Sequence, residues 1–359
     1  MNIERIPLSY RGKTIMTYRC GTGNDVVVLL HGSGCDHALL SWDGVLERLG
    51  KRTRVYAIDL PGYGESDPLE EIPEEGFYPY YHHCLEAIVD QLKLDRFVLV
   101  GLSMGGAISI RYALAHPEQV CGLVPVSSWG LSEKVGLHGL SSWLIHRRDF
   151  VRNTCRKLAQ SPAMTKFYVQ NVLFGRKNTC SPELVAQLQE LLNKDSVLDS
   201  IEFFQRSSIT PKGAIPYFGE ELSKLKMPVL LVQGKRDPLV PRSHAERASR
   251  IITNSRLHIM PSCKHWCCKE QPELFYQALW AFVKRDCLFS YKNMLPVQPV
   301  RAEERIPQTS AETVENPLRK NLKNRWEKRR KARTKLRLSS GNPVKKSVRR
   351  KQAILAKNR

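Results

Sequence analysis

The sequence predicts an α/β fold, in which helices cover both faces of a mostly parallel β-sheet. Continuously apolar runs such as Val26–Leu30, Phe97–Val100 and Met227–Gly234 are typical of strands that are buried on both faces. Helix-like segments such as Ala107–Ala115 separate these runs, and this alternation is typical of parallel sheets. With 359 residues, 42% of them hydrophobic, the chain is long enough for one large α/β domain with additions.

A glycine-rich loop, His31-Gly32-Ser33-Gly34, follows the first of these predicted strands. Backbone amides in such a loop can donate to a negatively charged oxygen. We predict Ser33 N–H as such a donor, with Gly34 N–H as the alternative. His31 directly precedes the first glycine, and we expect it to order the loop.

The strand over Phe97–Val100 leads through Gly101-Leu102-Ser103-Met104-Gly105-Gly106 into a helix-like segment. Strand, sharp turn and helix together form the setting of a nucleophile elbow. Glycines on both sides of Ser103 allow the close backbone approach that this turn requires, whereas a simple helix N-cap would not need them. The Met104 N–H then lies at a helix N-terminus, where partial positive charge favours a developing oxyanion.

Two later loops supply the acid and the base that activate a serine nucleophile. Asp237 follows the apolar run Met227–Gly234, and His265 follows the predicted strand Arg256–Met260. Asp237 alone fits an ordinary turn and His265 alone fits a surface loop. Their joint occurrence, in the order serine, acid, histidine after predicted strands, favours a catalytic triad with Ser103 as nucleophile.

The remaining histidines and the cysteines have simpler interpretations. The histidines at 82, 83, 244 and 258 fall in predicted helices or strands, where structural or solvated roles are expected. The ten unevenly spaced cysteines are expected to be free thiols. A zinc interpretation of Cys263, His265, Cys267 and Cys268 is disfavoured, because tetrahedral sites usually draw ligand pairs from separate parts of the chain. We predict no catalytic metal and no cofactor.

With these motifs the chain resembles a serine-nucleophile member of the α/β-hydrolase fold superfamily over residues 1–288. The segment Ile58–Asp67 is similar to the turn after the fourth strand of that superfamily. Ser103 argues against the branches that use an aspartate nucleophile on epoxides or carbon–halogen bonds. Residues 124–129 contain no acid after the sixth strand, which favours Asp237. One departure is that Cys263-Lys264 stands where many members have glycine before the histidine, and the charge of Lys264 could disfavour a protonated His265.

The resemblance implies an eight-stranded sheet with a helical lid inserted after strand 6. The predicted organisation is a core of residues 1–129 and 220–288, a lid of residues 130–219 and a linker of residues 289–318. Seven lid aromatics could line an apolar pocket or form the lid's own core: Trp143, Phe167, Tyr168, Phe203, Phe204, Tyr217 and Phe218.

A basic tail over residues 319–359 ends the chain and is expected to be disordered in isolation. It carries 18 Lys or Arg and one acid, Glu327, a net charge of +17 out of +21 for the whole protein. Nonspecific RNA or DNA binding, nuclear or nucleolar targeting, adhesion to an anionic membrane and an unselected extension remain open for it. The N-terminal residues lack an apolar signal, so we expect a cytoplasmic protein, with nuclear targeting by the tail if its source is eukaryotic.

The sequence therefore predicts a hydrolase that cleaves a small carboxylic ester through an acyl-enzyme. An amide, a thioester or an activated carbon–carbon bond is a less favoured substrate. Two alternatives remain: a lyase or cofactor-free oxidative enzyme on the same triad, and an adaptor or nucleic-acid-binding protein with a vestigial hydrolase body. Fold alone does not name the substrate.

Overall fold

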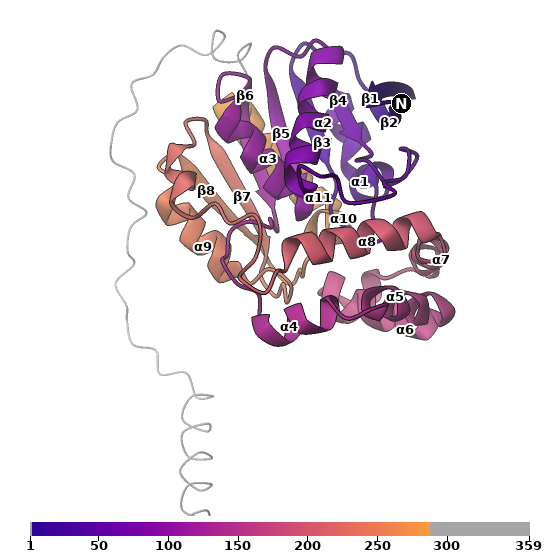
Figure 1. Ribbon diagram of the computed structural model, residues 1–359. Helices are drawn as coiled ribbons and strands as arrows, with labels where there is room; N and C mark the ends of the chain where they lie inside the picture. The colour runs from indigo at the N-terminus through magenta and orange to yellow at the C-terminus, as the bar shows by residue number, and fades with distance from the viewer. Residues whose placement is uncertain (1, 288–359) are drawn as a thin grey trace, which may run out of the picture. The chain divides into compact units, whose positions relative to one another are not determined.

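The computed structural model describes residues 2–287. Their strands form one eight-stranded sheet in the order β1-β2-β4-β3-β5-β6-β7-β8 (Figure 1). The pairs β1·β2 and β2·β4 are antiparallel. The pairs β4·β3, β3·β5, β5·β6, β6·β7 and β7·β8 are parallel. The predicted mostly parallel sheet of eight strands is confirmed. The strands are β1 Ile3–Tyr10, β2 Lys13–Cys20, β3 Val26–Leu30, β4 Arg54–Ile58, β5 Phe97–Leu102, β6 Val120–Val126, β7 Val229–Gly234 and β8 Ser255–Met260.

Helices cover both faces of the sheet. Successive apolar residues of the central strands point to opposite sides, so both faces have to be buried. In β3, Val28 and Leu30 belong to one core cluster, and Val27 and Leu29 belong to the other. The first face carries α2 Phe77–Gln91, α3 Met104–Ala115 and α9 Arg242–Ile251. The second carries α1 Ala38–Gly50, the short α10 Cys267–Glu270 and α11 Pro272–Phe282.

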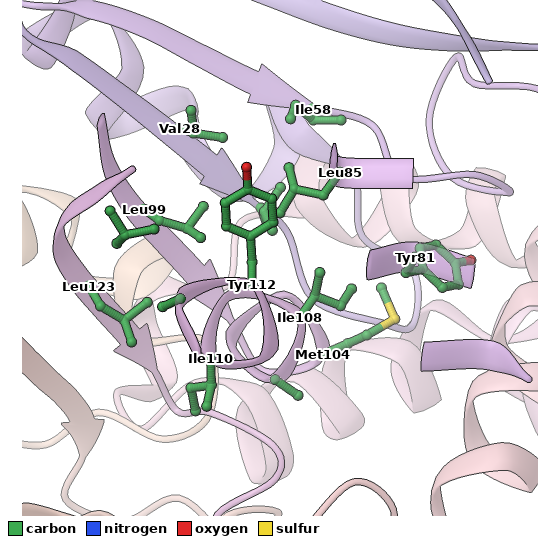
Figure 2. Packing of buried hydrophobic residues seen from close by; sticks show 14 of the residues in the cluster. Val28, Ile58, Tyr81, Leu85, Leu99, Met104, Ile108, Ile110, Tyr112 and Leu123 are labelled. Atoms are coloured by element: carbon green, nitrogen blue, oxygen red, sulfur yellow. The ribbon is translucent and has the colours of Figure 1, made fainter. Parts of the chain in front are cut away.

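The packing of α3 against the sheet holds the start of this helix in place. Figure 2 shows the Tyr112 ring of α3 between Leu99 of β5 and Leu85 of α2, with Val28 of β3 beyond it and Ile108 on the side of Leu85. These side chains are at most 1% exposed. Burial of this kind stabilises the fold by about 1.5–3 kcal/mol for each large apolar side chain. The N-terminus of α3, which carries the predicted nucleophile turn, is therefore fixed by the core.

The helical lid lies between β6 and β7, as predicted. Its α-helices are α4 His138–Ile145, α5 Phe150–Gln160, α6 Pro162–Tyr168, α7 Pro182–Leu192 and α8 Asp195–Ser208, with a π-helical turn at Val169–Leu173 and short 3₁₀ turns at Lys177–Thr179 and Gly219–Lys224. Serine caps begin two of them, since Ser161 accepts from Met164 N–H and Ser181 accepts from Leu184 N–H. A further π-helical turn, Val283–Cys287, follows α11.

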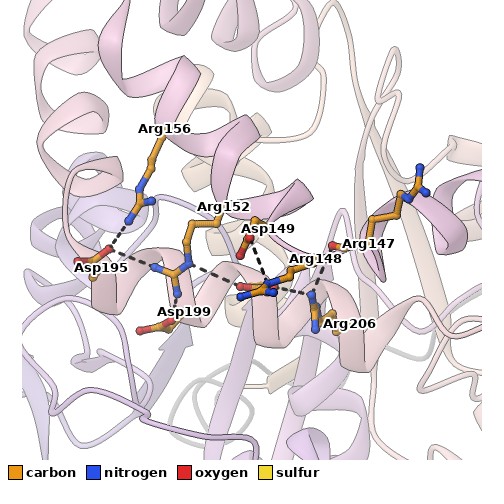
Figure 3. Close-up of polar contacts among 9 residues, drawn as sticks. Arg147, Arg148, Asp149, Arg152, Arg156, Asp195, Asp199 and Arg206 are labelled. Atoms are coloured by element: carbon orange, nitrogen blue, oxygen red, sulfur yellow. Dashed lines mark hydrogen bonds and ion pairs between the residues drawn. The ribbon is translucent and has the colours of Figure 1, made fainter.

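Ion pairs join α5 to α8 within the lid. Arg152 contacts Asp195, Asp199 and Glu202, and Arg156 shares Asp195 with it (Figure 3). Beneath them Val151 and Cys155 of α5 pack with α8 in a small apolar cluster of their own. Part of the lid thus has an apolar cluster of its own, and the segment around Leu173 and Leu188 packs with the core of the sheet.

Two predictions fall outside the described residues: the linker at 289–318 and the basic tail at 319–359. Within residues 2–287, no helix is long and apolar enough to cross a membrane.

Candidate active site

Ser103 stands in a strained turn between β5 and α3. Its φ is 50° and its ψ is −110°, a conformation that a non-glycine residue adopts at an energetic cost. The neighbouring glycines are required sterically. A Cβ on Gly101 would lie 2.2 Å from the carbonyl oxygen of Gly105, and one on Gly105 would lie 2.5 Å from that of His31. The glycine pattern in the sequence thus corresponds to backbone contacts that leave no room for a side chain.

Asp237 and His265 meet at the carboxyl ends of β7 and β8. The Nδ1 of His265 lies 2.8 Å from Oδ2 of Asp237. The other carboxylate oxygen accepts the backbone N–H groups of Leu239 and Val240, both at 2.9 Å, and the side-chain amide of Gln233 donates to Oδ2 at 2.9 Å. Burial by itself would raise the pKa of Asp237, but His265 and the donated hydrogen bonds outweigh it and lower the pKa.

Ser103 and His265 line one small cavity of about 40 Å³. Both side chains are almost wholly buried, as 8% of each residue is exposed. Because Asp237 holds Nδ1, the Nε2 of His265 is the nitrogen left for a proton from the serine. The core supplies Ser33, Leu102 and Trp266 to the cavity wall, and the lid segment supplies Tyr168 and Leu173.

The loop after β3 lies beside Ser103 in the same cavity, with Gly32, Ser33 and Gly34 in its wall. The Nε2 of His31 accepts the Leu60 N–H at 3.0 Å, so Nδ1 carries the proton and donates to the carbonyl of Gly32 at 2.6 Å. Burial lowers the pKa of His31 to about 4. Both ring nitrogens thus serve the loop, in agreement with the ordering role expected for this residue.

Met104 is the first residue of α3, so its N–H has no helical carbonyl to donate to. Ser33 N–H and Met104 N–H come from two elements that meet at this cavity. They remain our predicted oxyanion donors.

A buried carboxylate that the sequence analysis missed supports the same loop. Asp36 accepts the N–H of Gly32 at 2.8 Å and the hydroxyl of Ser41 at 2.7 Å, and the indole N–H of Trp266 donates to that hydroxyl at 2.9 Å. Burial raises the pKa of Asp36 to about 7, against the opposing effect of these hydrogen bonds. Asp36 thus connects the loop after β3 with the residue next to His265, and no spacing in the sequence indicated this link.

A second set of missed residues fastens the lid to the loop that carries His265. Glu270, whose side chain is fully buried, accepts the backbone N–H groups of Gly175 at 2.7 Å and Arg176 at 2.6 Å. The Lys264 ammonium donates to the carbonyls of Gln170 and Asn171 at 2.8 and 2.7 Å. These contacts hold the end of the lid segment that supplies Tyr168 and Leu173 to the cavity.

Most of the lid aromatics do not line this cavity, contrary to one of the two interpretations. Tyr168 does, whereas Phe218 is 1% exposed within the core. The side chains of Phe203 and Phe204 pack against the same core, and Trp143, Phe167 and Tyr217 are 43–68% exposed. Of the seven, one therefore lines the cavity, three pack against the core and three are exposed.

The segment around Cys263 does not gather as a metal site among the described residues. His265 is engaged by Asp237, and the Cys267 thiol lies 3.8 Å from the hydroxyl of Ser127. All ten cysteines lie within the described residues and none is in a disulfide, in agreement with the expected thiols.

Comparison with known proteins identifies the class. The family model of the alpha/beta hydrolase fold matches residues 25–272, and this chain belongs to that family. A relative from Escherichia coli, 2-hydroxy-6-oxononadienedioate/2-hydroxy-6-oxononatrienedioate hydrolase, is 28% identical over 282 residues, which are 76% of this chain and 93% of the relative.

Solved structures of hydrolases have the same fold. A meta-cleavage product hydrolase from Pseudomonas fluorescens is 21% identical with a TM-score of 0.61, covering 76% of this chain and 94% of that one. A carboxylesterase from Bacillus subtilis is 22% identical with a TM-score of 0.60, covering 79% of this chain and 92% of that one. The protein is an α/β-hydrolase, similar both to enzymes that cleave carbon–carbon bonds and to esterases.

Proposed function

We propose that this protein hydrolyses a carboxylic ester through a Ser103 acyl-enzyme. The observation that carries the proposal is the shared cavity of Ser103, in its strained turn, and His265, whose Nδ1 is held by Asp237. Strain at the serine, a base beside it and an acid behind the base are the arrangement that activates a serine hydroxyl.

In the proposed reaction, Nε2 of His265 takes the proton of Ser103 while its oxygen bonds to the ester carbonyl carbon. Ser33 N–H and Met104 N–H donate to the resulting oxyanion. The bond to the leaving oxygen then breaks, and His265 protonates the departing alcohol. His265 then takes a proton from a water molecule, which attacks the acyl-enzyme and releases the acid. Asp237 stabilises the charged imidazole at both stages.

The charge of the cavity favours a neutral ester over a dicarboxylate. No lysine or arginine lines it among residues 2–287, and Asp36 contributes a carboxyl group. The Escherichia coli relative is named for a dioate, a substrate with two carboxylates. The two carboxylates of such a substrate would find no positive side chain in the wall of this cavity and would lie near the carboxyl group of Asp36. Removing them from water would therefore cost free energy. Carbon–carbon hydrolysis of such a dioate is therefore our second candidate.

Fluorophosphonate labelling of the full-length protein tests the proposal without knowledge of the substrate. We expect labelling of the wild type, its loss in Ser103→Ala, and a sharp decrease in His265→Ala and Asp237→Asn. Ser223→Ala, which changes an exposed serine, serves as the matched control and should label as the wild type does. A folded wild-type protein that does not label would overturn the proposal.

A substrate panel separates the two candidates. We expect turnover of p-nitrophenyl esters, with acyl lengths from acetate to octanoate, and at least about 100-fold lower kcat/KM for 2-hydroxy-6-oxononadienedioate. The reverse ranking would establish carbon–carbon hydrolysis as the function of the same triad, because both reactions would still require Ser103.

We further propose that the tail at 319–359 binds RNA or DNA phosphates without sequence preference. Its net charge of +17 supports this, since basic clusters release counterions from nucleic acid. A protein lacking residues 316–359 should lose salt-sensitive RNA binding and keep ester hydrolysis. Equal RNA affinity in the truncated protein would exclude the proposal.

A further inference from the structure

Three potential metal ligands gather between α2 and α3, at the far end of α3 from Ser103. His82 and Glu86 lie one helical turn apart on α2, and His116 caps the C-terminus of α3. The helix α3 has 12 residues and is about 18 Å long, so this cluster is separate from the catalytic cavity. The proposed mechanism does not use this cluster.

The ligand atoms already face one another. Oε1 of Glu86 lies 2.6 Å from Nε2 of His116 and 3.3 Å from Nε2 of His82, and the three atoms all lie within 4.8 Å of one another. The Nδ1 of His82 is buried, so Nε2 is the nitrogen that the ring presents to Glu86. The two imidazole rings are stacked with an angle of 29° between them.

From this geometry we infer that His82, Glu86 and His116 form a binding site for a zinc ion. Two imidazole nitrogens and one carboxylate oxygen are a donor set that zinc accepts, with water as a fourth ligand. In a tetrahedral site with bonds of about 2.0–2.1 Å, neighbouring ligand atoms lie about 3.4 Å apart. The separation of Glu86 from His82, 3.3 Å, matches this value, and that of Glu86 from His116, 2.6 Å, must lengthen by about 0.8 Å.

The surroundings permit such a site. The side chains of His82, Glu86 and His116 are 12%, 31% and 29% exposed, so an ion and its water can reach the ligand atoms. The carboxylate of Glu118 lies 3.8 Å from Nδ1 of His116. A side-chain movement of about 1 Å would let it accept the second ring N–H of that histidine, as outer carboxylates do in zinc sites. Arg111 is the nearby cation, and it pairs with Glu221 at 4.0 Å.

A bound zinc ion would tie α2 to α3, the helix whose other end carries Ser103. Because the three ligands come together only in the folded protein, zinc should stabilise the folded state by mass action. The site is structural in this inference, and ester hydrolysis should not depend on it.

Zinc titration of the full-length protein, stripped of metal with a chelator, tests the site. By isothermal titration calorimetry and thermal melting we expect one Zn²⁺ per chain and a rise in Tm, with no effect of Mg²⁺, which prefers six oxygen ligands. Glu86→Gln and His82→Gln should weaken zinc binding by at least about 100-fold, more than the loss of an outer partner would. His83→Gln, on the same helix but outside the cluster, should bind as the wild type does.

Zinc affinity that is unchanged in Glu86→Gln and His82→Gln would overturn the inference, as would the absence of binding to the wild type. X-ray absorption at the zinc edge provides a test that needs no variant. Nitrogen and oxygen neighbours at about 2.0–2.1 Å are expected, whereas a sulfur shell at about 2.3 Å would place the ion on cysteines and exclude this site.

Discussion

Hydrogen-bond partners divide the histidines of this protein into different roles. In His31 both ring nitrogens are occupied, one by the Leu60 N–H and the other by the Gly32 carbonyl. In His265 the Nδ1 is held by Asp237, and the residue lines the cavity that Ser103 also lines. Both residues follow strands in the sequence, so a strand followed by a histidine does not by itself identify a base.

The buried His31 should make the protein sensitive to acid. As the pH falls below 6.5 an unfolded histidine takes up a proton, whereas the pKa of His31 in the folded state is about 4, so acid favours unfolding. Between pH 7 and pH 5 the free energy of unfolding of the wild type should decrease by about 1–2 kcal/mol more than that of His31→Gln. Urea denaturation at the two pH values measures this.

The exposed His83 provides the control for that experiment. His83→Gln should keep the wild-type difference between pH 7 and pH 5. An equal pH dependence in wild type and His31→Gln would mean that burial does not hold His31 neutral.

At the scale of elements, the turn from β5 to α3 depends on close backbone contact with β3. Gly105→Ala would place a methyl group 2.5 Å from the His31 carbonyl oxygen and 2.6 Å from that of Leu30. We expect a loss of about 1–3 kcal/mol in the free energy of unfolding and weaker fluorophosphonate labelling, because the turn must shift.

Gly139→Ala is a matched substitution in α4, where nothing lies within 4 Å of the added Cβ. It should leave labelling unchanged and stabilise the helix by about 0.5–1 kcal/mol. Similar losses of labelling in both variants would contradict the steric explanation of the turn.

Glu270 should stabilise the contact between the lid and the loop of His265. In Glu270→Ala the N–H groups of Gly175 and Arg176 lose a buried acceptor, at a cost of about 1–3 kcal/mol each. We expect a decrease of more than about 2 kcal/mol in the free energy of unfolding. The KM for the esters should also increase, because Tyr168 and Leu173 form part of the cavity wall.

Glu273→Ala removes an exposed carboxylate that pairs with Arg48 and should change stability by less than about 1 kcal/mol. Chemical denaturation and ester kinetics of both variants make the comparison. A loss in Glu270→Ala no greater than in Glu273→Ala would show that the lid is held by other contacts.

At the scale of the whole molecule, most of the net charge and the predicted catalytic groups occupy different parts of the chain. Residues 1–318 carry a net charge of +4, whereas residues 319–359 carry +17. The residues that line the cavity of Ser103 and His265 all lie between positions 32 and 266. We therefore expect the function of the tail to depend on salt concentration and the function of residues 1–318 to be independent of it.

Ionic strength should separate these two functions. Raising NaCl from 50 to 500 mM should change kcat/KM for a neutral ester by less than about twofold, because no charge is attracted to the cavity. RNA binding should weaken by more than about 100-fold over the same range, as counterion release requires. Fluorescence anisotropy with a labelled RNA and ester assays in the same buffers test this. A parallel salt dependence of both would indicate that the tail acts on the catalytic cavity.

The sequence by itself determined the mostly parallel sheet, the turn around Ser103 and the order of the predicted triad. These features depend on local chemistry, since strand patterning, flanking glycines and loop positions are readable along the chain. The tertiary structure alone decided the contacts of Ser41 with Trp266, of Glu270 with Gly175, and of Glu86 with His116. Such contacts join residues 30 to more than 200 positions apart, and only the packing of the elements brings them within hydrogen-bond distance.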